Sequence, residues 1–482
     1  IYDTWETILL NQFHDIIPGS SIKEVYDDSD ADYARVMKDG KELLSGSLNA
    51  FAKTVKGQDL CVVFNQLAFK RVDTVKLRTD KDFTCVYDIS GERIPGQTVI
   101  EDNKKYFLFE ARLCSMGYTI FRLSDEKCIV DDNSFVATCN MMENKHLKVV
   151  FDDFMNISSI YDKDAKREVV QKGQTANKIT AFEDKPLTYQ AWDINIYYNE
   201  KPYEINDVTY SALVEDGPVR KCIRVDRKIL ETTITQYISL ECNSRKIDFK
   251  TVIDCKHDDL LLKAAFPVDV HTDYATYDIQ FGNVRRPTHW NTSWDYARFE
   301  VCAHKWADLS EDDYGVSILN DCKYGHDIKD SVIRLTLLKS ATEPDPDADR
   351  GLHEFTYSLY PHVGDFKKAH TVDMAYKLNF RPYAKYVEKG TGDIENYRSF
   401  MTCNHENVIV DTLKKAEEGD GLILRVYECF NRRTECTIDL NFEVSKITEC
   451  DLMENDIADA VIEDNVLKFT IRPYEIKTFK IS

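Results

Sequence analysis

The chain has 482 residues, of which 43% are hydrophobic and 11% aromatic, enough apolar material for several packed cores and evidence against wholesale disorder. Its 83 acidic and 62 basic side chains give a formal net charge of −21. This charge repels phosphate backbones and anionic lipid, and no segment has the length of a membrane span. We therefore expect no nucleic-acid partner and no membrane.

The fourteen cysteines are scattered from Cys61 to Cys450 without a CxxC pair. A chain of this size needs no disulfide staples, so the pattern predicts free thiols and a cytoplasmic protein. The chain opens on a helical pattern, without a start methionine or a basic-then-apolar leader. This opening predicts the inner part of a longer protein.

Apolar residues recur at helical spacing between Trp5 and Phe13 and predict a first helix that ends at Pro18-Gly19. Ser21 and Glu24 then form the S-x-x-E pattern of a capping box, and the helix that follows runs into the low fifties. We therefore expect a helical hairpin over residues 1–56, the remnant of a helical bundle.

Beyond about Gly57 the apolar residues alternate with polar ones, as in "KIDFKTVID" and "CTIDLNFEV". Many strands of this kind predict a mainly β fold of stacked antiparallel β-sandwiches. We expect a small sandwich over 57–125, a large one over 126–392 and a small C-terminal one over 393–482. "DTLKKAEEGDG" is compatible with a short helix or with a charged hairpin turn, and "HKWADLSEDDYGVSILNDCKYG" with two strands around an acidic turn.

His14 and Asp15 place two titratable groups where the first helix is expected to stop. Unpaired carbonyl groups at a helix C-terminus favour a cation, either an imidazolium or a bound metal. A neighbouring carboxylate can orient the ring or accept a hydrogen bond from a ligand hydroxyl. The alternative is that His14 caps the helix and Asp15 is a turn residue, because one histidine is not a metal site.

The segment "FGNVRRPTHWNTSWDYARFE", residues 281–300, gathers arginines, a histidine, tryptophans and hydroxyl residues around Pro287. This mixture is typical of sugar-binding surfaces, since aromatic faces suit C–H surfaces and planar polar groups suit hydroxyls. An aromatic sheet edge that fills a domain interface is the alternative. The triplets "HDD" at His257 and "HTD" at His271 match a zinc-ligand spacing, but chance matches are expected, and we interpret both as structural.

The stretch "WETILLNQFHDIIPGSSI" resembles the segment of glycoside hydrolase family 38 α-mannosidases that closes their catalytic site. The stretches "YDIQFGNVRRPTHWNTSWDYARFEV", "HKWADLSEDDYGVSILNDCKYG" and "GLHEFTYSLYPH" extend the resemblance toward the C-terminal third. They are most similar to the cytosolic-type and bacterial branch of that family.

The resemblance implies a retaining, metal-dependent α-mannosidase that hydrolyses terminal α-mannosides of oligosaccharides, with a large sandwich of the mutarotase-like supersandwich type. Zinc, or cobalt in some members, holds adjacent mannose hydroxyls, and two carboxylates carry out the reaction. Carried over to this sequence, His14 is expected to be a metal ligand and Asp15 to bind a mannose hydroxyl. Arg286, His289 and Asn291 are expected to line the substrate site.

The sequence departs from the family pattern because it lacks the N-terminal domain that carries the nucleophile, the acid/base and a metal-binding HxD pair. We therefore expect no catalytic residue in this chain, a weak or absent metal, and no activity without the rest of the enzyme. The alternatives are a non-catalytic carbohydrate-binding module and a sandwich with its own activity, such as sugar epimerisation. A mannose-containing oligosaccharide is the expected partner, and a homo-oligomer stays open.

Overall fold

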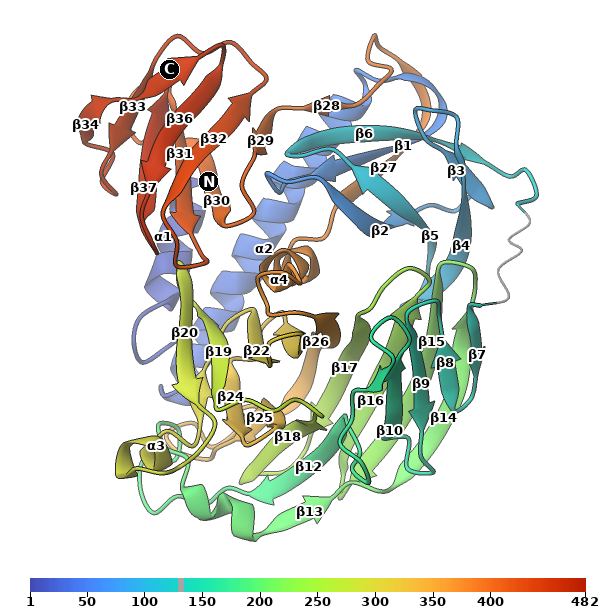
Figure 1. Ribbon diagram of the computed structural model, residues 1–482, viewed down its shortest axis with the longest axis vertical. Helices are drawn as coiled ribbons and strands as arrows, with labels where there is room; N and C mark the ends of the chain where they lie inside the picture. The colour runs from blue at the N-terminus through green and yellow to red at the C-terminus, as the bar shows by residue number, and fades with distance from the viewer. Residues whose placement is uncertain (129–133) are drawn as a thin grey trace. The chain divides into compact units, whose positions relative to one another are not determined.

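The computed structural model describes residues 1–128 and 134–482 and shows a helical N-terminus followed by antiparallel β-sheets (Figure 1). This arrangement confirms the mainly β fold predicted from the alternating pattern. The described residues of 1–51, 132–277 and 285–369 form one compact unit, and those of 52–131, 278–284 and 370–482 form a second. We call them unit 1 and unit 2; the division into four consecutive domains stays a prediction.

The hairpin of unit 1 consists of α1 (Tyr2–Asn11) and α2 (Lys23–Ala52). The hairpin was expected, but α1 ends at Asn11 and not at Pro18-Gly19. The amide of Phe13 donates to the carbonyl of Leu10, three residues back, so the chain tightens into turns before the proline is reached. His14 therefore lies in a turn beyond the helix.

Three sheets belong mainly to unit 1. The six-stranded sheet has the order β13 (Pro202–Glu204), β12 (Lys178–Glu183), β18 (Leu260–Pro267), β25 (Val332–Ser340), β24 (Gly325–Lys329) and β21 (Val301–Cys302). The nine-stranded sheet has the order β14 (Val208–Asp216), β15 (Arg220–Ile229), β16 (Thr232–Glu241), β17 (Ile247–Cys255), β26 (Gly351–Val363), β23 (Tyr314–Asn320), β22 (Trp306–Ser310), β19 (Tyr274–Ile279) and β20 (Gly282–Pro287). The five-stranded sheet has the order β11 (Arg167–Glu168), β10 (Ile157–Asp162), β9 (Leu147–Phe151), β8 (Met141–Glu143) and β7 (Val136–Thr138).

Aromatic side chains join the six-stranded and nine-stranded sheets into a sandwich. Phe266 of β18 lies 5.9 Å from Phe249 of β17 and 6.1 Å from Tyr357 of β26, between ring centroids. Short helices connect the strands: η1 (Ile196–Glu200) and α3 (Ser293–Ala297). The acidic segment at 304–325 forms β22, a turn and β23, as the sequence predicted.

Unit 2 also contains three sheets and the helix α4 (Thr371–Asn379). The eight-stranded sheet has the order β2 (Arg71–Arg78), β5 (Lys104–Leu113), β4 (Arg93–Glu101), β3 (Cys85–Tyr87), β6 (Gly117–Ser124), β1 (Lys56–Asn65) and β27 (Tyr383–Thr391), with β28 (Arg398–Ser399) also paired to β6. The four-stranded sheet has the order β29 (Met401–Cys403), β32 (Thr434–Leu440), β36 (Val466–Ile471) and β35 (Val461–Glu463). The five-stranded sheet has the order β30 (Val408–Lys415), β31 (Leu422–Glu428), β37 (Ile476–Ile481), β33 (Ile447–Cys450) and β34 (Asp456–Asp459).

The last two sheets share one hydrophobic core, which makes the C-terminal part a small sandwich. Ile438 of β32 and Leu467 of β36 pack in the same cluster as Leu424 of β31 and Phe479 of β37. The segment "DTLKKAEEGDG" forms the end of β30 and a hairpin turn, closed by the amide of Ala416 on the carbonyl of Gly421.

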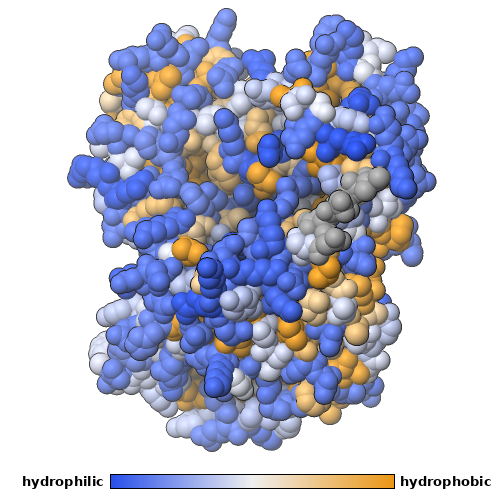
Figure 2. Space-filling view, turned by 45° about the vertical axis from the view of Figure 1, so that its right-hand side comes forward, coloured by the Kyte–Doolittle hydropathy of each residue, from blue (hydrophilic) through white to orange (hydrophobic). Residues whose placement is uncertain are grey.

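The surface matches the composition. Figure 2 shows hydrophilic residues over most of the visible face, with hydrophobic side chains scattered among them. All fourteen cysteines are free thiols, as their spacing predicted. Among the helices within 1–128 and 134–482, none combines the length and apolar character that crossing a membrane requires.

Tryptophan burial gives a direct test of the unit 1 core. Trp306 is 1% exposed and stacks on Phe366 at 5.0 Å, whereas Trp294 is 79% exposed. Trp306→Ala should lower the free energy of unfolding by about 3–5 kcal/mol because it leaves a large cavity. Trp294→Ala should change it by less than about 0.5 kcal/mol. Urea unfolding followed by circular dichroism measures both, and equal effects would contradict this core.

Candidate functional site

The turn between α1 and α2 presents His14 and Asp15 to solvent. The His14 side chain is 77% exposed and that of Asp15 50%, with 3.6 Å between His14 Nε2 and Asp15 Oδ2. The imidazole packs against the ring of Phe13, with 4.4 Å between centroids. The contacts described for the two side chains lie within the turn itself, so the turn does not bring them to other candidate residues.

The backbone of this turn is held from α2. The hydroxyl of Ser21 donates to the Asp15 carbonyl at 2.7 Å, and the Tyr26 hydroxyl reaches the same carbonyl at 3.3 Å. The Ser21 hydroxyl therefore bonds backward into the turn, and not forward as the capping-box pattern predicted. The result is a fixed backbone that carries two accessible polar side chains.

A metal centre is not complete in this part of the molecule. A structural or catalytic zinc site needs three or four protein ligands, and His14 supplies one nitrogen. Within 1–128 and 134–482 there is no group of three or more histidine, cysteine, aspartate or glutamate side chains that could hold an ion. The residues present therefore do not fit a zinc or cobalt site by themselves, and the metal stays a prediction.

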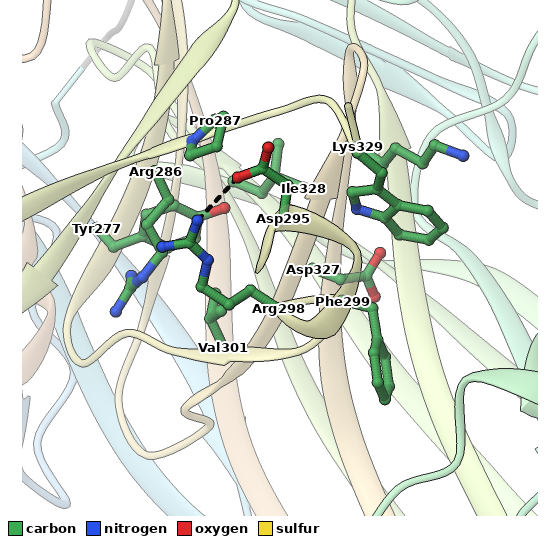
Figure 3. Close-up of a pocket in the computed structure, with 11 residues that line it drawn as sticks. Tyr277, Arg286, Pro287, Asp295, Arg298, Phe299, Val301, Asp327, Ile328 and Lys329 are labelled. Atoms are coloured by element: carbon green, nitrogen blue, oxygen red, sulfur yellow. Dashed lines mark hydrogen bonds and ion pairs between the residues drawn. The ribbon is translucent and has the colours of Figure 1, made fainter. Parts of the chain in front are cut away.

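The tryptophan-rich segment forms a small pocket in unit 1 (Figure 3). Arg286 of β20 lies over the ring of Tyr277, 4.6 Å from its centroid, and the ammonium of Lys329 lies 4.0 Å from the Trp290 ring centroid. The remaining wall comes from the end of β20, from α3 and the residues after it, and from β21 and β24: Pro287, Asp295, Arg298, Phe299, Val301, Asp327 and Ile328. The enclosed volume is about 10 Å³, the room that one water molecule or one hydroxyl group needs.

The pocket carboxylate Asp295 is already bound by its own neighbours. Thr292 Oγ1 donates to Asp295 Oδ2 at 2.8 Å, and Arg298 Nη2 donates to Oδ1 at 2.8 Å, the contact dashed in Figure 3. The Thr292 hydroxyl, followed by Arg298, lowers the pKa of Asp295. Asp295 thus holds α3 in place and is not free to act as a base.

The second pocket carboxylate, Asp327, belongs to a buried ion network on one face of the six-stranded sheet. Its Oδ2 accepts from Lys263 Nζ at 2.6 Å and its Oδ1 from Arg334 Nε at 2.6 Å, while Lys263 also binds Glu300. Burial alone would lower the pKa of Lys263, but Glu300 and Asp327 raise it above its usual value. Burial raises the pKa of Glu300. The network is not apparent from the sequence, because Lys263, Glu300, Asp327 and Arg334 lie in four separate segments of the chain.

Arg286 is the pocket group that still needs a partner. Its Nη1 is buried and has no hydrogen-bond acceptor, and burial lowers the pKa of the guanidinium. The oxygen of a ligand hydroxyl group would accept the hydrogen bond that Arg286 Nη1 lacks. Of the other two predicted wall residues, His289 Nδ1 lies 3.9 Å from Asp295 Oδ2, and Asn291 is exposed and outside the pocket lining.

A buried His–Asp–Ser group elsewhere in unit 1 is structural. His362 Nε2 meets both Asp308 Oδ2, at 2.9 Å, and Ser317 Oγ, at 3.1 Å, while its Nδ1 bonds the carbonyl of Gly364. A nucleophilic triad needs the two ring nitrogens divided between acid and hydroxyl, and a route for substrate. Here Nε2 alone contacts both the carboxylate and the hydroxyl, and all three side chains are buried.

Three family models match separate parts of this chain. Residues 142–347 match the glycosyl hydrolases family 38 C-terminal domain, 407–479 the family 38 C-terminal beta sandwich domain, and 1–51 the alpha mannosidase middle domain. Alpha-mannosidase G of Dictyostelium discoideum is 32% identical over 99% of this chain and 47% of its own length. Human alpha-mannosidase 2C1 is 31% identical over 98% of this chain and 44% of its own. The chain thus spans about half the length of these curated relatives.

Solved structures show the same fold. The crystal structure of an alpha-mannosidase from Enterococcus faecalis V583 has a TM-score of 0.81, covers 99% of this chain and 63% of its own, and is 17% identical in sequence. At this identity the likeness concerns the fold alone.

The ion network and the pocket arginine should respond differently to removal of charge. Arg334→Met leaves Asp327 and Glu300 short of one cation and should lower the free energy of unfolding by about 3 kcal/mol. Arg286→Met removes a guanidinium with an unpaired nitrogen and should cost less than about 1 kcal/mol. Urea denaturation of the two variants measures the difference, and a larger loss for Arg286→Met would contradict the assignment.

His326, beside the network on β24, should make the fold acid-sensitive. Burial lowers its pKa from 6.5 to about 4, and its Nε2 has no hydrogen-bond partner. The unfolded chain therefore binds a proton between pH 6.5 and 4 that the folded chain does not, so stability falls as pH drops through this window. From the two pKa values, the loss at pH 5 is about 2 kcal/mol.

The His326→Leu variant should lack this part of the pH dependence, whereas His271→Leu, at an exposed histidine, should keep it. Denaturation at pH 7 and pH 5 measures both. Identical pH profiles for wild type and His326→Leu would show that His326 is not buried as a neutral group.

Proposed function

Because this chain belongs to glycosyl hydrolase family 38, we propose that it is the part of a retaining α-mannosidase that completes and walls the substrate site. The substrate would be the terminal α-mannoside of an oligosaccharide. The observation that carries the proposal is the collinear likeness to α-mannosidases over 99% and 98% of this chain.

The chain alone is proposed to be inactive. A retaining glycosidase needs a carboxylate nucleophile and a second carboxylate as acid and base on either side of the scissile bond. The two carboxylates at the pocket, Asp295 and Asp327, are both held in ion pairs. The nucleophile and the acid/base would therefore come from a further segment, of the kind that makes the relatives about twice as long.

The hairpin supports such an association. The side chains of Trp5, Leu9 and Phe13 are 57–62% exposed, an unusual amount of apolar surface for one short stretch. We propose that this face packs against the segment that carries the two catalytic carboxylates. His14 would then be one ligand of a divalent metal, zinc or cobalt, whose other ligands lie in that segment, and Asp15 would accept a hydrogen bond from a mannose hydroxyl.

The unit 1 pocket would bind one hydroxyl group of the sugar. Arg286 offers an unpaired donor, the enclosed volume fits a hydroxyl and excludes a sugar ring, and Trp290 supplies an aromatic wall. His289 and Asn291 would contribute at the rim. The free thiols fit a reducing compartment, for which we propose the cytoplasm.

A non-catalytic carbohydrate-binding protein is the second candidate. The described residues are compatible with it, since they contain no complete metal group and His14 supplies a single ligand. The two candidates differ in turnover and not in sugar binding.

An activity assay on an aryl α-mannoside, with zinc or cobalt added, tests the proposal. The 482-residue chain should show no turnover. A longer protein that contains this chain and the additional segment of the relatives should be active, and His14→Ala there should lower kcat/KM by at least about 100-fold.

His271→Ala is the matched control in that longer protein, because His271 is an exposed histidine with an aspartate nearby in sequence, Asp273, but is interpreted as structural. It should leave kcat/KM unchanged. Substantial hydrolysis by the 482-residue chain would refute the proposal that the two catalytic carboxylates lie in a further segment. A longer protein that is inactive but still binds mannosides would favour the second candidate.

A further inference from the structure

A larger groove lies in unit 2, where the strand β4 changes partners. Residues Arg93–Pro95 pair with β3, whereas Gly96–Glu101 pair with β5. The pairing of β4 with β5 ends at Gly96 and Phe109, and a groove of about 600 Å³ opens beside Arg112 and Leu113. Gly96 permits the bend, since a Cβ at this position would overlap the ring of Phe107. This volume suits a ligand of small-oligosaccharide size.

The groove combines apolar surface with an exposed aromatic ring. Leu113 and Phe121 are buried beneath it, while Val72, Ile89 and Tyr397 are 46%, 53% and 51% exposed. Such surfaces bind the C–H faces of sugar rings, and the tyrosine adds a hydroxyl to its ring. Arg71 also lines the groove, but its side chain is fully buried.

Arg71 is fixed in place but incompletely bonded. Its Nη1 donates to the carbonyl of Phe380 at 2.7 Å and lies 3.3 Å from Asp73 Oδ2, while its Nε has no hydrogen-bond acceptor. Burial lowers the pKa of Arg71 to about 10. Because its side chain is fully buried, this guanidinium supports the floor of the groove and is not itself open to a ligand.

Charged residues of both signs line the groove. Arg112 lies 3.8 Å from Glu92, with both side chains more than half exposed, and Asp88 is bonded to its own turn through Ser90 and Glu92. The lining contains four basic side chains, Lys70, Arg71, Arg93 and Arg112, against three acidic ones, Asp88, Glu92 and Glu110. This balance disfavours a strongly charged ligand. Adjacent donors and acceptors suit the paired hydroxyls of a neutral sugar.

We propose that this groove of unit 2 is an accessory binding site for a neutral oligosaccharide, separate from the pocket of unit 1. That the sugar is a mannoside rests on the proposed function. The groove lies outside all three ranges matched by family 38 domains. An added peptide strand is disfavoured, because Pro95 has no amide hydrogen to donate at the open edge.

Titration calorimetry of the 482-residue chain with linear mannotriose at millimolar concentrations tests the site. The wild-type chain should bind, and Tyr397→Ala and Arg112→Gln should each weaken the affinity about tenfold through loss of a stacking face or of charged donors. Tyr161→Ala and Arg122→Gln are matched controls, because both side chains are exposed and outside the groove, and they should bind like wild type. Circular dichroism should show all four variants folded.

The outcomes separate this inference from the proposed function. Binding that survives both groove substitutions but is lost in Arg286→Met would place the sugar in unit 1 and overturn the accessory site while leaving the proposed function intact. No binding of mannotriose by the wild-type chain would overturn the mannoside assignment of the groove. Binding of maltotriose in its place, weakened by the same two substitutions, would keep the groove as a sugar site and contradict its link to α-mannosidase activity.

Discussion

The buried ammonium of Lys263 is the constraint on which the unit 1 pocket depends. A lysine on the face of a sheet, covered by η1 and the segment before β21, is tolerated only when carboxylates neutralise it. Glu300 and Asp327 do so from two different segments, and Arg334 balances the remaining charge. The segment that follows α3 is therefore tied to the sheet at Glu300, and the pocket wall formed by Arg298 and Phe299 is fixed with it.

This arrangement decides which groups of the pocket are available to a ligand. Asp327 is committed to the network and Asp295 to the start of α3, so neither is a free acid or base. Arg286 is left with an unpaired nitrogen beside a volume that fits one hydroxyl. The pocket can thus accept one polar group of hydroxyl size, whereas neither of its two carboxylates is free to act as an acid or a base.

The sequence predicted some of these features, and the reasons differ from residue to residue. The hairpin was predictable because helical periodicity is local, but the end of α1 was not, since three-residue turns after Asn11 replace the last helical turns. Arg286 was selected with its aromatic neighbours because they are close in the chain, and the pocket contains it. Asn291, from the same motif, is exposed, because a motif gives no side-chain directions. Lys263 was not selected at all, since a single lysine in an apolar strand carries no signal until its partners are known.

The sequence by itself determined the mainly β fold, the helical hairpin, the free thiols and the resemblance to family 38, because periodicity, spacing and motifs are properties of neighbouring residues. The tertiary structure alone decided which charges are paired, how little room the unit 1 pocket has, and that β4 divides between two partners to open a second groove. Those features depend on strands that are far apart in the chain but adjacent in a sheet. The electrostatic cost of burying a charge is set by those distant neighbours and not by the residues beside it in sequence.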